Sequence, residues 1–372
     1  MPIAFFFIFI YDIENIYGTE LGNSQSNQSD IYKLFLTCIM VKTVKVSVLM
    51  SVHNAQAYLC DAVDSILNQT FNDFEFIIID DGSTDHTLKL IQAYANKDFR
   101  IKIHKNQENY GLTRSLNLGL KLCEGKYIAR MDADDFSDPS RLQKQVNYLD
   151  QNPEISLVSV GRWYIAPNGL IYDIKVYPDN HKYLCKLLLK GINVLDHGCI
   201  MIRKDIIMKF DEPYRFFYSQ DFDLWLRLME QHEKFGMIQE PLHYRRRNIY
   251  SVSSSLQGKR KQISNLIVEL NYLRKSNQPE GDWKSKELAI ISEPLKNSSS
   301  TYYRHFFYNG KAFFFNKAFD RARSEFFVLL KHHPKVLIYW IYMLLSCMGT
   351  PGYSIWKLIS ICKNKQQNRI LF

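Results

Sequence analysis

Three carboxylates follow a short apolar segment in the middle of the chain. The segment, residues 126–131, is predicted to be a strand. The acids at its end are Asp132, Asp134 and Asp135. Hard divalent ions prefer oxygen ligands, and Mg²⁺ is usually held by one or two carboxylates together with the phosphates of a substrate. The spacing therefore indicates a metal-dependent nucleotide site, although a solvated acidic turn is the alternative for an isolated Asp-x-Asp.

Two other predicted strands also end in polar side chains. Residues 46–50 are apolar and rich in β-branched side chains, and they run into Ser51. The nearly continuous apolar run 74–79 ends just before Asp81. Ligands of open parallel sheets bind beyond the carboxyl ends of the strands. We therefore expect Ser51 and Asp81 to lie close to the acids at Asp132.

The elements that position these residues alternate between strand and helix. Apolar side chains at helical spacing predict helices within residues 58–67, 88–95 and 112–120, and a further strand is expected at 101–104. The order β-α-β-α-β-α-β implies right-handed crossovers and a mainly parallel sheet with helices on both faces. The predicted fold class is α/β.

Composition limits the class of protein further. The chain has 372 residues, of which 46% are hydrophobic and 23% charged, so a sizeable core and two or three domains are expected. Its net charge of +9 would suit nucleic acid, an anionic membrane or acidic substrates, but no nucleic-acid motif is present. The seven cysteines are scattered without a C-x-x-C pair, which supports neither a disulfide framework nor a zinc site. A reducing, cytoplasmic environment is the simpler expectation.

The first part of the chain carries no pattern of a folded domain. Residues 1–10 form an apolar run that is too short to span a bilayer and lacks the basic start of a signal peptide. Residues 18–30 resemble a polar linker. We expect Met40 to be the true start and residues 1–41 to be a dispensable arm.

Residues 45–255 resemble family two of the inverting glycosyltransferases, which have the Rossmann-like GT-A fold. The segments that carry this resemblance stand in the family's order: 46–54, 65–70, 77–85, 109–112, 125–135 and 220–228. The resemblance implies a GT-A domain over residues 42–255. It further implies transfer with inversion from a nucleotide sugar, most often a UDP-sugar, to a saccharide or lipid-linked acceptor. Cell-surface polysaccharide or glycolipid synthesis is the expected setting.

The resemblance also implies a role for each matching residue. Asp81, with Ser51 nearby, is expected to bind the nucleotide base, and Asp132 is expected near the ribose. Asp134 would ligate a Mn²⁺ or Mg²⁺ ion that bridges the diphosphate. Asp221 matches the catalytic base of the family. A capping carboxylate at a helix N-terminus is the alternative for Asp221, because a helical pattern follows it.

One position departs from the family pattern. The residue before the base is usually acidic, and here it is Gln220. A neutral amide cannot raise the pKa of its neighbour by charge repulsion. The reaction class is unaffected, but a nucleotide-sugar-binding protein without catalysis becomes an alternative. A sugar-phosphate nucleotidyltransferase is the other alternative, although no glycine-rich phosphate loop is found near the start.

Other candidate residues have less specific signals. His197 matches an acceptor-side segment, but a lone histidine is more often structural. Arg245 could reach a diphosphate or belong to a solvated basic turn. Asp135 is expected to support the metal site from behind or to cap the helix that follows it. Arg141 is expected to pack against these acids or to pair with one of them.

The pattern changes after residue 255. Apolar spacing predicts helices near 266–273, 302–315, 318–331 and 336–348 in a C-terminal helical region, residues 256–372. From Lys335 onward the tail has aromatic, aliphatic and basic residues but no acid. This composition is typical of a segment that lies on an anionic membrane surface. The alternative is that 336–348 is the last helix of a packed bundle.

Overall fold

The computed structural model describes residues 44–247, 259–292 and 300–358. The predicted N-terminal arm, residues 1–41, lies outside the described residues, and so does the domain boundary expected at residue 255. Every element predicted between residues 46 and 132 is present, and its ends agree with the prediction to within two residues.

Four parallel strands form the first half of the sheet, in the order β3-β2-β1-β4. The strands are β1 (Val46–Val52), β2 (Phe74–Asp80), β3 (Ile101–Lys105) and β4 (Tyr127–Asp132). The helices between them are α3 (Leu59–Leu67), α4 (Thr87–Ala95) and α5 (Leu112–Leu122). The predicted alternation of strand and helix is therefore confirmed.

The second half of the sheet is mixed. Its strands are β5 (Phe136–Ser137), β6 (Ile155–Ile165), β7 (Ile171–Lys175), β8 (Met201–Arg203) and β9 (Lys234–Arg246). Strand β8 pairs antiparallel with both β4 and β6, while β6 and β9 are parallel to each other. The complete order is β3-β2-β1-β4-β8-β6-β9-β5, with β7 paired to β6. The parallel sheet predicted from the sequence is thus extended by antiparallel pairs.

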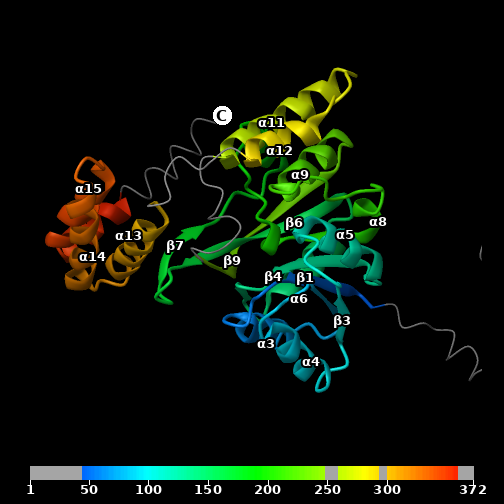
Figure 1. Cartoon of the computed structure of the whole chain (residues 1–372), viewed down its shortest axis with the longest axis horizontal. Coiled ribbons are helices and arrows are strands. Elements are labelled where there is room, and N and C mark those ends of the chain that lie inside the picture. The colour runs from blue at the N-terminus through cyan, green and yellow to red at the C-terminus, as the bar shows by residue number, and fades with distance from the viewer. Residues whose placement is uncertain (1–43, 248–258, 293–299, 359–372) are drawn as a thin grey trace, which may run out of the picture. The chain divides into compact units, whose positions relative to one another are not determined.

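Helices cover both faces of the sheet, as Figure 1 shows. On one face, α3, α4 and α6 (Arg141–Gln151) pack on alternate residues of β1, namely Val46, Val48 and Met50. Leu49 points to the other face. The elements with residues in the core on that face are α5, α7 (His181–Leu189), α8 (Lys204–Ile207), α9 (Gln220–Glu230), α11 (Lys259–Lys275) and α12 (Trp283–Ser292). Because side chains of a strand alternate between faces, one buried strand supplies both cores.

Of the four helices predicted after residue 255, the one near 266–273 is part of α11, and the other three are present as α13 (Ser300–Phe315), α14 (Phe319–His332) and α15 (Leu337–Cys347). They share a small core that includes Phe314, Phe326 and Tyr342. Helix α13 also lies against β7, where Asn316 Nδ2 donates to the carbonyl of Ile171 at 2.9 Å. None of the helices in the described parts of the chain is both long enough and apolar enough to cross a membrane.

Candidate active site

The carboxyl ends of β1, β2 and β4 bring three of the predicted residues to one edge of the sheet. Ser51 on β1 is the register partner of Asp132 on β4. The backbone N–H of Asp81 donates to the carbonyl of Val52 at 2.8 Å, which holds the end of β2 beside the end of β1. This convergence is the one expected for neighbouring parallel strands.

Asp81 is buried, with 3% of its surface exposed, and its carboxylate is well satisfied by its own chain. It accepts hydrogen bonds from Asn106 Nδ2 at 2.7 Å and from the backbone N–H groups of Tyr110 and Gly111, both at 2.9 Å. Gly111 has φ +85°, a conformation that favours glycine. Asp81 therefore fixes the turn before α5, and of the roughly four acceptor sites of a carboxylate about one, on Oδ2, remains for a nucleotide base.

Two of the three predicted acids are tied to the protein. Asp132 Oδ1 accepts from Arg130 Nη2 at 2.7 Å. Asp135 is buried and bonds β9, since His243 Nε2 lies 3.0 Å from one oxygen and the N–H of Arg246 donates to the other at 2.8 Å. Asp135 therefore does not cap the following helix, which was one of its two predicted roles, and it braces the acidic turn against β9.

Arg141 lies fully buried below the acidic turn. Its Nη1 donates to the carbonyl of Gly198 at 2.6 Å and to that of Arg130 at 3.2 Å. Both bonds go to backbone oxygens. Of the two predicted roles, packing is therefore the one that the structure shows.

The third acid, Asp134, is different because the only hydrogen bond that acts on its carboxylate within the described part of the chain comes from its own backbone. Burial, with the negative charges of Asp135 and Asp132, raises the pKa of Asp134 to about 8. A bound cation would remove this penalty. Over residues 44–247, 259–292 and 300–358, no group of three or more His, Cys, Asp or Glu side chains could hold a metal alone. Asp134 fits a divalent ion that takes its other ligands from a diphosphate.

Arginines face these acids from β6 and β9. Arg162 Nε lies 3.1 Å from Asp196 Oδ2, and Arg245 forms an ion pair with the same oxygen. Burial alone would raise the pKa of Asp196, but the charges of Arg245 and Arg162 hold it below its usual range. The charge of Asp196, followed by those of Asp135 and Asp132, raises the pKa of Arg245. Arg245 is therefore a paired residue near the acidic turn and not part of a solvated basic turn.

Asp221 lies in the first turn of α9 and is partly exposed. Its Oδ2 accepts from Asn193 Nδ2 at 2.7 Å, and its Oδ1 accepts from the N–H of Phe222 at 2.8 Å. Burial, and then the charge of Asp196, raises the pKa of Asp221 to about 6. Such a carboxylate is ionised at neutral pH and is more basic than an ordinary aspartate. It also bonds its own helix, so both predicted roles are compatible with this geometry.

The neighbours of Asp221 are less exposed. Gln220 is buried and contributes no charge. His197, in the short 3-10 helix η1 (His197–Cys199), is only 6% exposed, and its Nε2 lies 2.8 Å from the hydroxyl of Tyr214. Its ring also contacts Trp225 edge-on. Burial lowers the pKa of His197 well below its ordinary value. This placement favours a structural role and gives no support to contact with the acceptor.

Three charged or amide residues at the site were not singled out in the sequence: Arg162, Asn193 and Asp196. Arg162 could have been noticed as a cation within an otherwise buried strand. Asp196 directly precedes His197 in a segment that was already of interest. Nothing in the sequence indicated that Asn193 would bond Asp221.

Comparison with known proteins defines the class of this protein. The profile of glycosyl transferase family 2 matches residues 47–210. WbnJ, an O-antigen biosynthesis glycosyltransferase of Escherichia coli, is 39% identical over 187 residues, which cover 50% of this chain and 72% of WbnJ. The uncharacterized glycosyltransferase MJ1057 of Methanocaldococcus jannaschii is 35% identical over 199 residues, 52% of this chain and 68% of that protein. The chain belongs to glycosyl transferase family 2 and is a glycosyltransferase.

A solved structure agrees with this fold. S. aureus TarS 1–349, crystallised in complex with UDP-GlcNAc, matches with a TM-score of 0.50 and 14% identity, over 80% of this chain and 90% of that chain. At this level of identity the match concerns the fold alone. The predicted GT-A fold is confirmed.

Proposed function

We propose that this glycosyltransferase moves a sugar from a nucleotide-diphosphate sugar, in particular a UDP-sugar, to an acceptor hydroxyl with inversion. Family membership supports the transfer, and the name of WbnJ supports a setting in cell-surface polysaccharide or glycolipid synthesis. The observation that carries the mechanism is the carboxylate of Asp221, which is partly exposed and has a pKa raised to about 6.

Asp221 would act as the general base. An acceptor hydroxyl is a poor nucleophile until its proton is removed, and Asp221 Oδ2 or Oδ1 would take that proton. General-base catalysis typically contributes about 10²–10⁴-fold. Asn193 would orient the carboxylate through its 2.7 Å hydrogen bond. Attack from the face opposite the leaving diphosphate in a single displacement would give inversion.

The donor would lie over the carboxyl ends of β1 and β4. By resemblance to the family, Asp81 with Ser51 would position the base, and Asp132 the ribose. Asp134 would hold Mn²⁺ or Mg²⁺, an ion that neutralises charge developing on a departing diphosphate. Arg245 would supply further positive charge to the diphosphate near the acidic turn. Its guanidinium group would do so while it is paired with Asp196 or after that ion pair opens.

Loss of the family's acidic residue at Gln220 does not remove the base. Burial is the largest contribution to the raised pKa of Asp221, and the next comes from Asp196. Burial and Asp196 can thus raise the pKa of Asp221 in place of a glutamate at position 220. This observation favours catalysis over the alternative of a nucleotide-sugar-binding protein.

A panel of nucleotide sugars tests the proposed function. One UDP-sugar should protect the chain against thermal unfolding in the presence of Mn²⁺ and much less in the presence of EDTA. Transfer from that donor to a glycan or lipid extract should give a product whose anomeric proton shows the inverted configuration by NMR. Equal protection without Mn²⁺ would contradict the proposed metal dependence. A product with retained anomeric configuration would contradict the proposed inverting mechanism.

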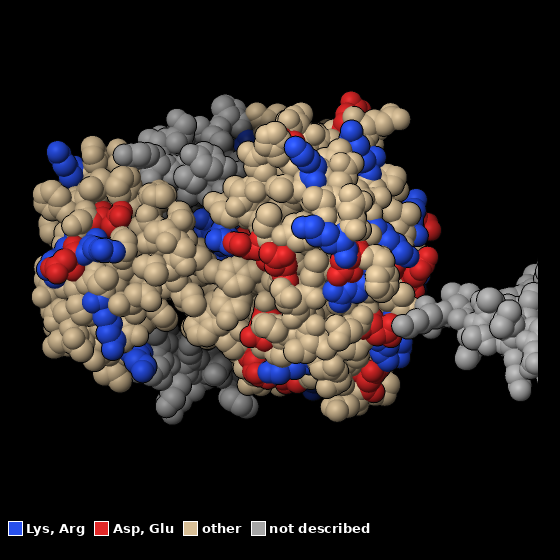
Figure 2. Space-filling model, turned by 90° about the horizontal axis from the view of Figure 1, so that it is seen from below, with Lys and Arg blue, Asp and Glu red and all other residues tan. Residues whose placement is uncertain are grey.

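The C-terminal helices are proposed to touch an anionic membrane surface, which would place the enzyme at the inner face of the cell membrane. Helix α15 exposes a stripe at helical spacing that includes Leu337 (70% exposed), Ile341 and Leu344 (61% exposed). Residues 300–358 contain eight Lys or Arg but two Asp or Glu. Figure 2 shows wide areas of these helices without charged side chains. An apolar stripe in a region with an excess of cations suits anionic lipid headgroups.

A further inference from the structure

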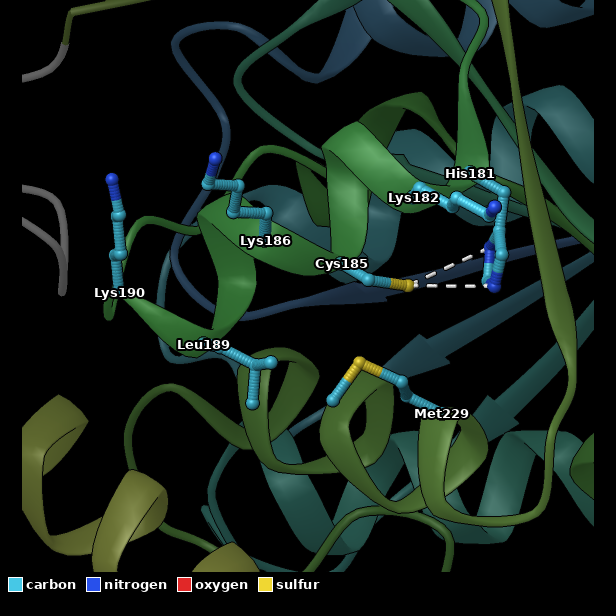
Figure 3. Close-up of a pocket in the computed structure, with 7 residues that line it drawn as sticks. All are labelled: His181, Lys182, Cys185, Lys186, Leu189, Lys190 and Met229. Carbon is cyan, nitrogen blue, oxygen red and sulfur yellow. Dashed lines mark hydrogen bonds between the residues drawn. The ribbon is translucent and has the colours of Figure 1, made fainter. Parts of the chain in front are cut away.

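A groove of about 500 Å³ runs along α7, and none of the acids at the end of β4 lines it (Figure 3). Most of its lining comes from α7 and the residue that caps it, Lys190, and Met229 near the end of α9 completes it. Its residues form two parallel rows on the helix, each at i, i+4, i+8 spacing. Such rows line one face of a helix.

The row nearest α9 forms an uncharged floor. It consists of His181, Cys185 and Leu189, with Met229 opposite. Burial and the charge of Lys234 lower the pKa of His181, and its Nδ1 accepts from the N–H of Phe235 at 3.1 Å. Burial raises the pKa of the Cys185 thiol. At neutral pH the floor therefore carries no charge and offers apolar and sulfur atoms to a ligand.

The second row is cationic. It consists of Lys182, Lys186 and Lys190, all exposed and none in an ion pair with another described residue. Lys234 and Lys275 add positive charge close to the floor. No acid lines the groove. Like charges at i, i+4 repel one another on an isolated helix, so this row gains stability when an anion binds between the ammonium groups.

Two elements relate the groove to the proposed base, namely the segment after α7 and helix α9. Lys190 is followed three residues later by Asn193, whose amide bonds Asp221. On helix α9, Met229 follows Asp221 by eight residues, or about 12 Å along the axis. A molecule whose hydroxyl reaches Asp221 could therefore place a second group, at about this distance, in the groove.

We propose that the groove is an acceptor subsite that binds a phosphate group of a phosphorylated acceptor. The lysine row contacts the phosphate, for which ammonium groups act as point charges, and the floor contacts the part of the acceptor next to it. The phosphate can belong to a lipid-linked acceptor or to a soluble phosphorylated glycan. This inference rests on the proposed function because it takes Asp221 as the base.

The test follows the ¹³C-labelled methyl group of Met229 by NMR in the full chain, with the resonance assigned from Met229→Leu. The probes are inorganic tripolyphosphate and vesicles of phosphatidylglycerol, with phosphatidylcholine vesicles as a reference. The Met229 resonance should shift or broaden with at least one anionic probe. The triple variant Lys182→Gln, Lys186→Gln, Lys190→Gln should weaken this response at least about tenfold, equivalent to 1.4 kcal/mol or more.

A matched control removes three charges elsewhere: Lys89→Gln, Lys97→Gln and Lys121→Gln. These lysines are exposed and lie on or near α4 and α5. The control should respond like the wild type. A response to tripolyphosphate assigns the site to soluble phosphate, and a response to phosphatidylglycerol alone assigns it to lipid phosphate. No Met229 response to either probe, or equal weakening in the control, would overturn the proposal.

The variant Asp221→Asn separates this proposal from the proposed function. This variant should keep the Met229 response, because Asp221 does not line the groove. If Asp221→Asn retained full transfer, the proposed base would be wrong while the binding measurement at Met229 would stand by itself. If the Met229 response were absent and Asp221→Asn lost transfer, only the groove would be wrong.

Discussion

At the scale of single residues, Asp134 and Asp221 have raised pKa values but different partners. The neighbours that act on Asp134 are mainly other acids, so its negative charge is unfavourable until a cation arrives. Asp221 accepts two hydrogen bonds that stabilise its charge, so it stays ionised near neutral pH. Pairs of carboxylates whose environments separate their pKa values commonly have separate tasks. Here the tasks would be metal binding and proton abstraction.

Replacement of Asp134 by Asn should stabilise the metal-free protein at pH 8. An acid whose pKa is raised to about 8 on folding stabilises the folded state at low pH, and this contribution is lost as the pH rises from about 4 to 8. We expect the melting temperature at pH 8 without metal to rise by at least about 2 °C, which corresponds to a gain of at least about 0.5–1 kcal/mol in the free energy of unfolding.

The same variant should lose Mn²⁺-dependent binding of UDP in calorimetric titrations. Asp205→Asn, an exposed acid on α8, is the control and should change neither property. Retained Mn²⁺-dependent affinity in Asp134→Asn would show that the ion binds elsewhere.

Replacement of Asn193 by Ala should move the acid limb of the pH profile. The hydrogen bond from Asn193 lowers the pKa of Asp221, so its loss should raise that pKa above about 6. Hydrogen bonds to charged groups are worth about 1.5–3 kcal/mol, or about one pKa unit or more. Because the base must be deprotonated, kcat/KM should fall at a higher pH in the variant. A purely structural role would lower kcat/KM at every pH without shifting the limb.

At the scale of elements, α9 positions Asp221 through a buried ion network. Asp223, which is fully buried two residues further on, lies 2.9 Å from Arg215 Nη2 and 2.8 Å from Arg227 Nε. Arg215 also pairs with Glu280 at 2.8 Å, which connects this network to the segment between α11 and α12. The start of α9 is thus held by charges as well as by the apolar core.

Replacement of Asp223 by Asn should destabilise the fold by about 3–5 kcal/mol, because it leaves the guanidinium group of Arg227 without its counter-charge and removes one of two counter-charges from Arg215. Urea denaturation measures this change. Glu212→Gln changes an exposed side chain of the residue whose backbone carbonyl accepts from Arg227 Nη1, and it should have an effect of less than about 0.5 kcal/mol. Equal effects of the two substitutions would mean that the network does not anchor α9.

The parallel half of the sheet could be predicted because each of its elements has a local pattern and pairs with a near neighbour in the chain. Strands β6 and β9 could not be predicted in the same way. Polar residues and Gly161 interrupt β6, Pro241 interrupts β9, and their pairing shows shifts in register. Only the fold brings these two strands together, and with them Arg162 and Arg245.

The residues of the candidate site also fall into a predictable and an unpredictable group. Residues at strand ends, such as Asp132 and Asp134, could be predicted because a strand pattern leads into them. Asn193 and Asp196 lie in irregular backbone, and their partners are distant in the sequence, at Asp221 and Arg245. The local sequence pattern does not predict that a residue in irregular backbone will contact a partner that is distant in the chain. The burial of His197 likewise depends on Tyr214 and Trp225, which its own neighbourhood in the sequence does not reveal.

At the scale of the whole molecule, membrane contact should depend on α15. The variant Leu337→Gln, Ile341→Gln, Leu344→Gln should pellet less with anionic vesicles at low salt, because it removes apolar area that enters the interface. Binding by the unchanged chain should be partly released at high salt, since electrostatic adsorption is screened. Removal of residues 349–372 should also reduce pelleting without loss of donor binding.

The matched control for α15 replaces exposed apolar residues outside α13, α14 and α15: Phe99→Gln, Leu122→Gln and Leu288→Gln. This control should pellet like the unchanged chain. Vesicle binding that is lost equally in both triple variants, or absent at every salt concentration, would mean that the α15 stripe serves another purpose.

The central claim is that Asp221 is the base of a sugar transfer, and the transfer rate of Asp221→Asn tests it most directly. With the UDP-sugar identified by thermal protection, transfer of radiolabelled sugar to acceptor extract should fall by about 10²–10⁴-fold. The affinity for the donor should stay within about twofold, because the proposed donor contacts belong to Asp81, Asp132 and Asp134. Transfer at the unchanged rate, or a loss of donor affinity as large as the loss of rate, would contradict this assignment.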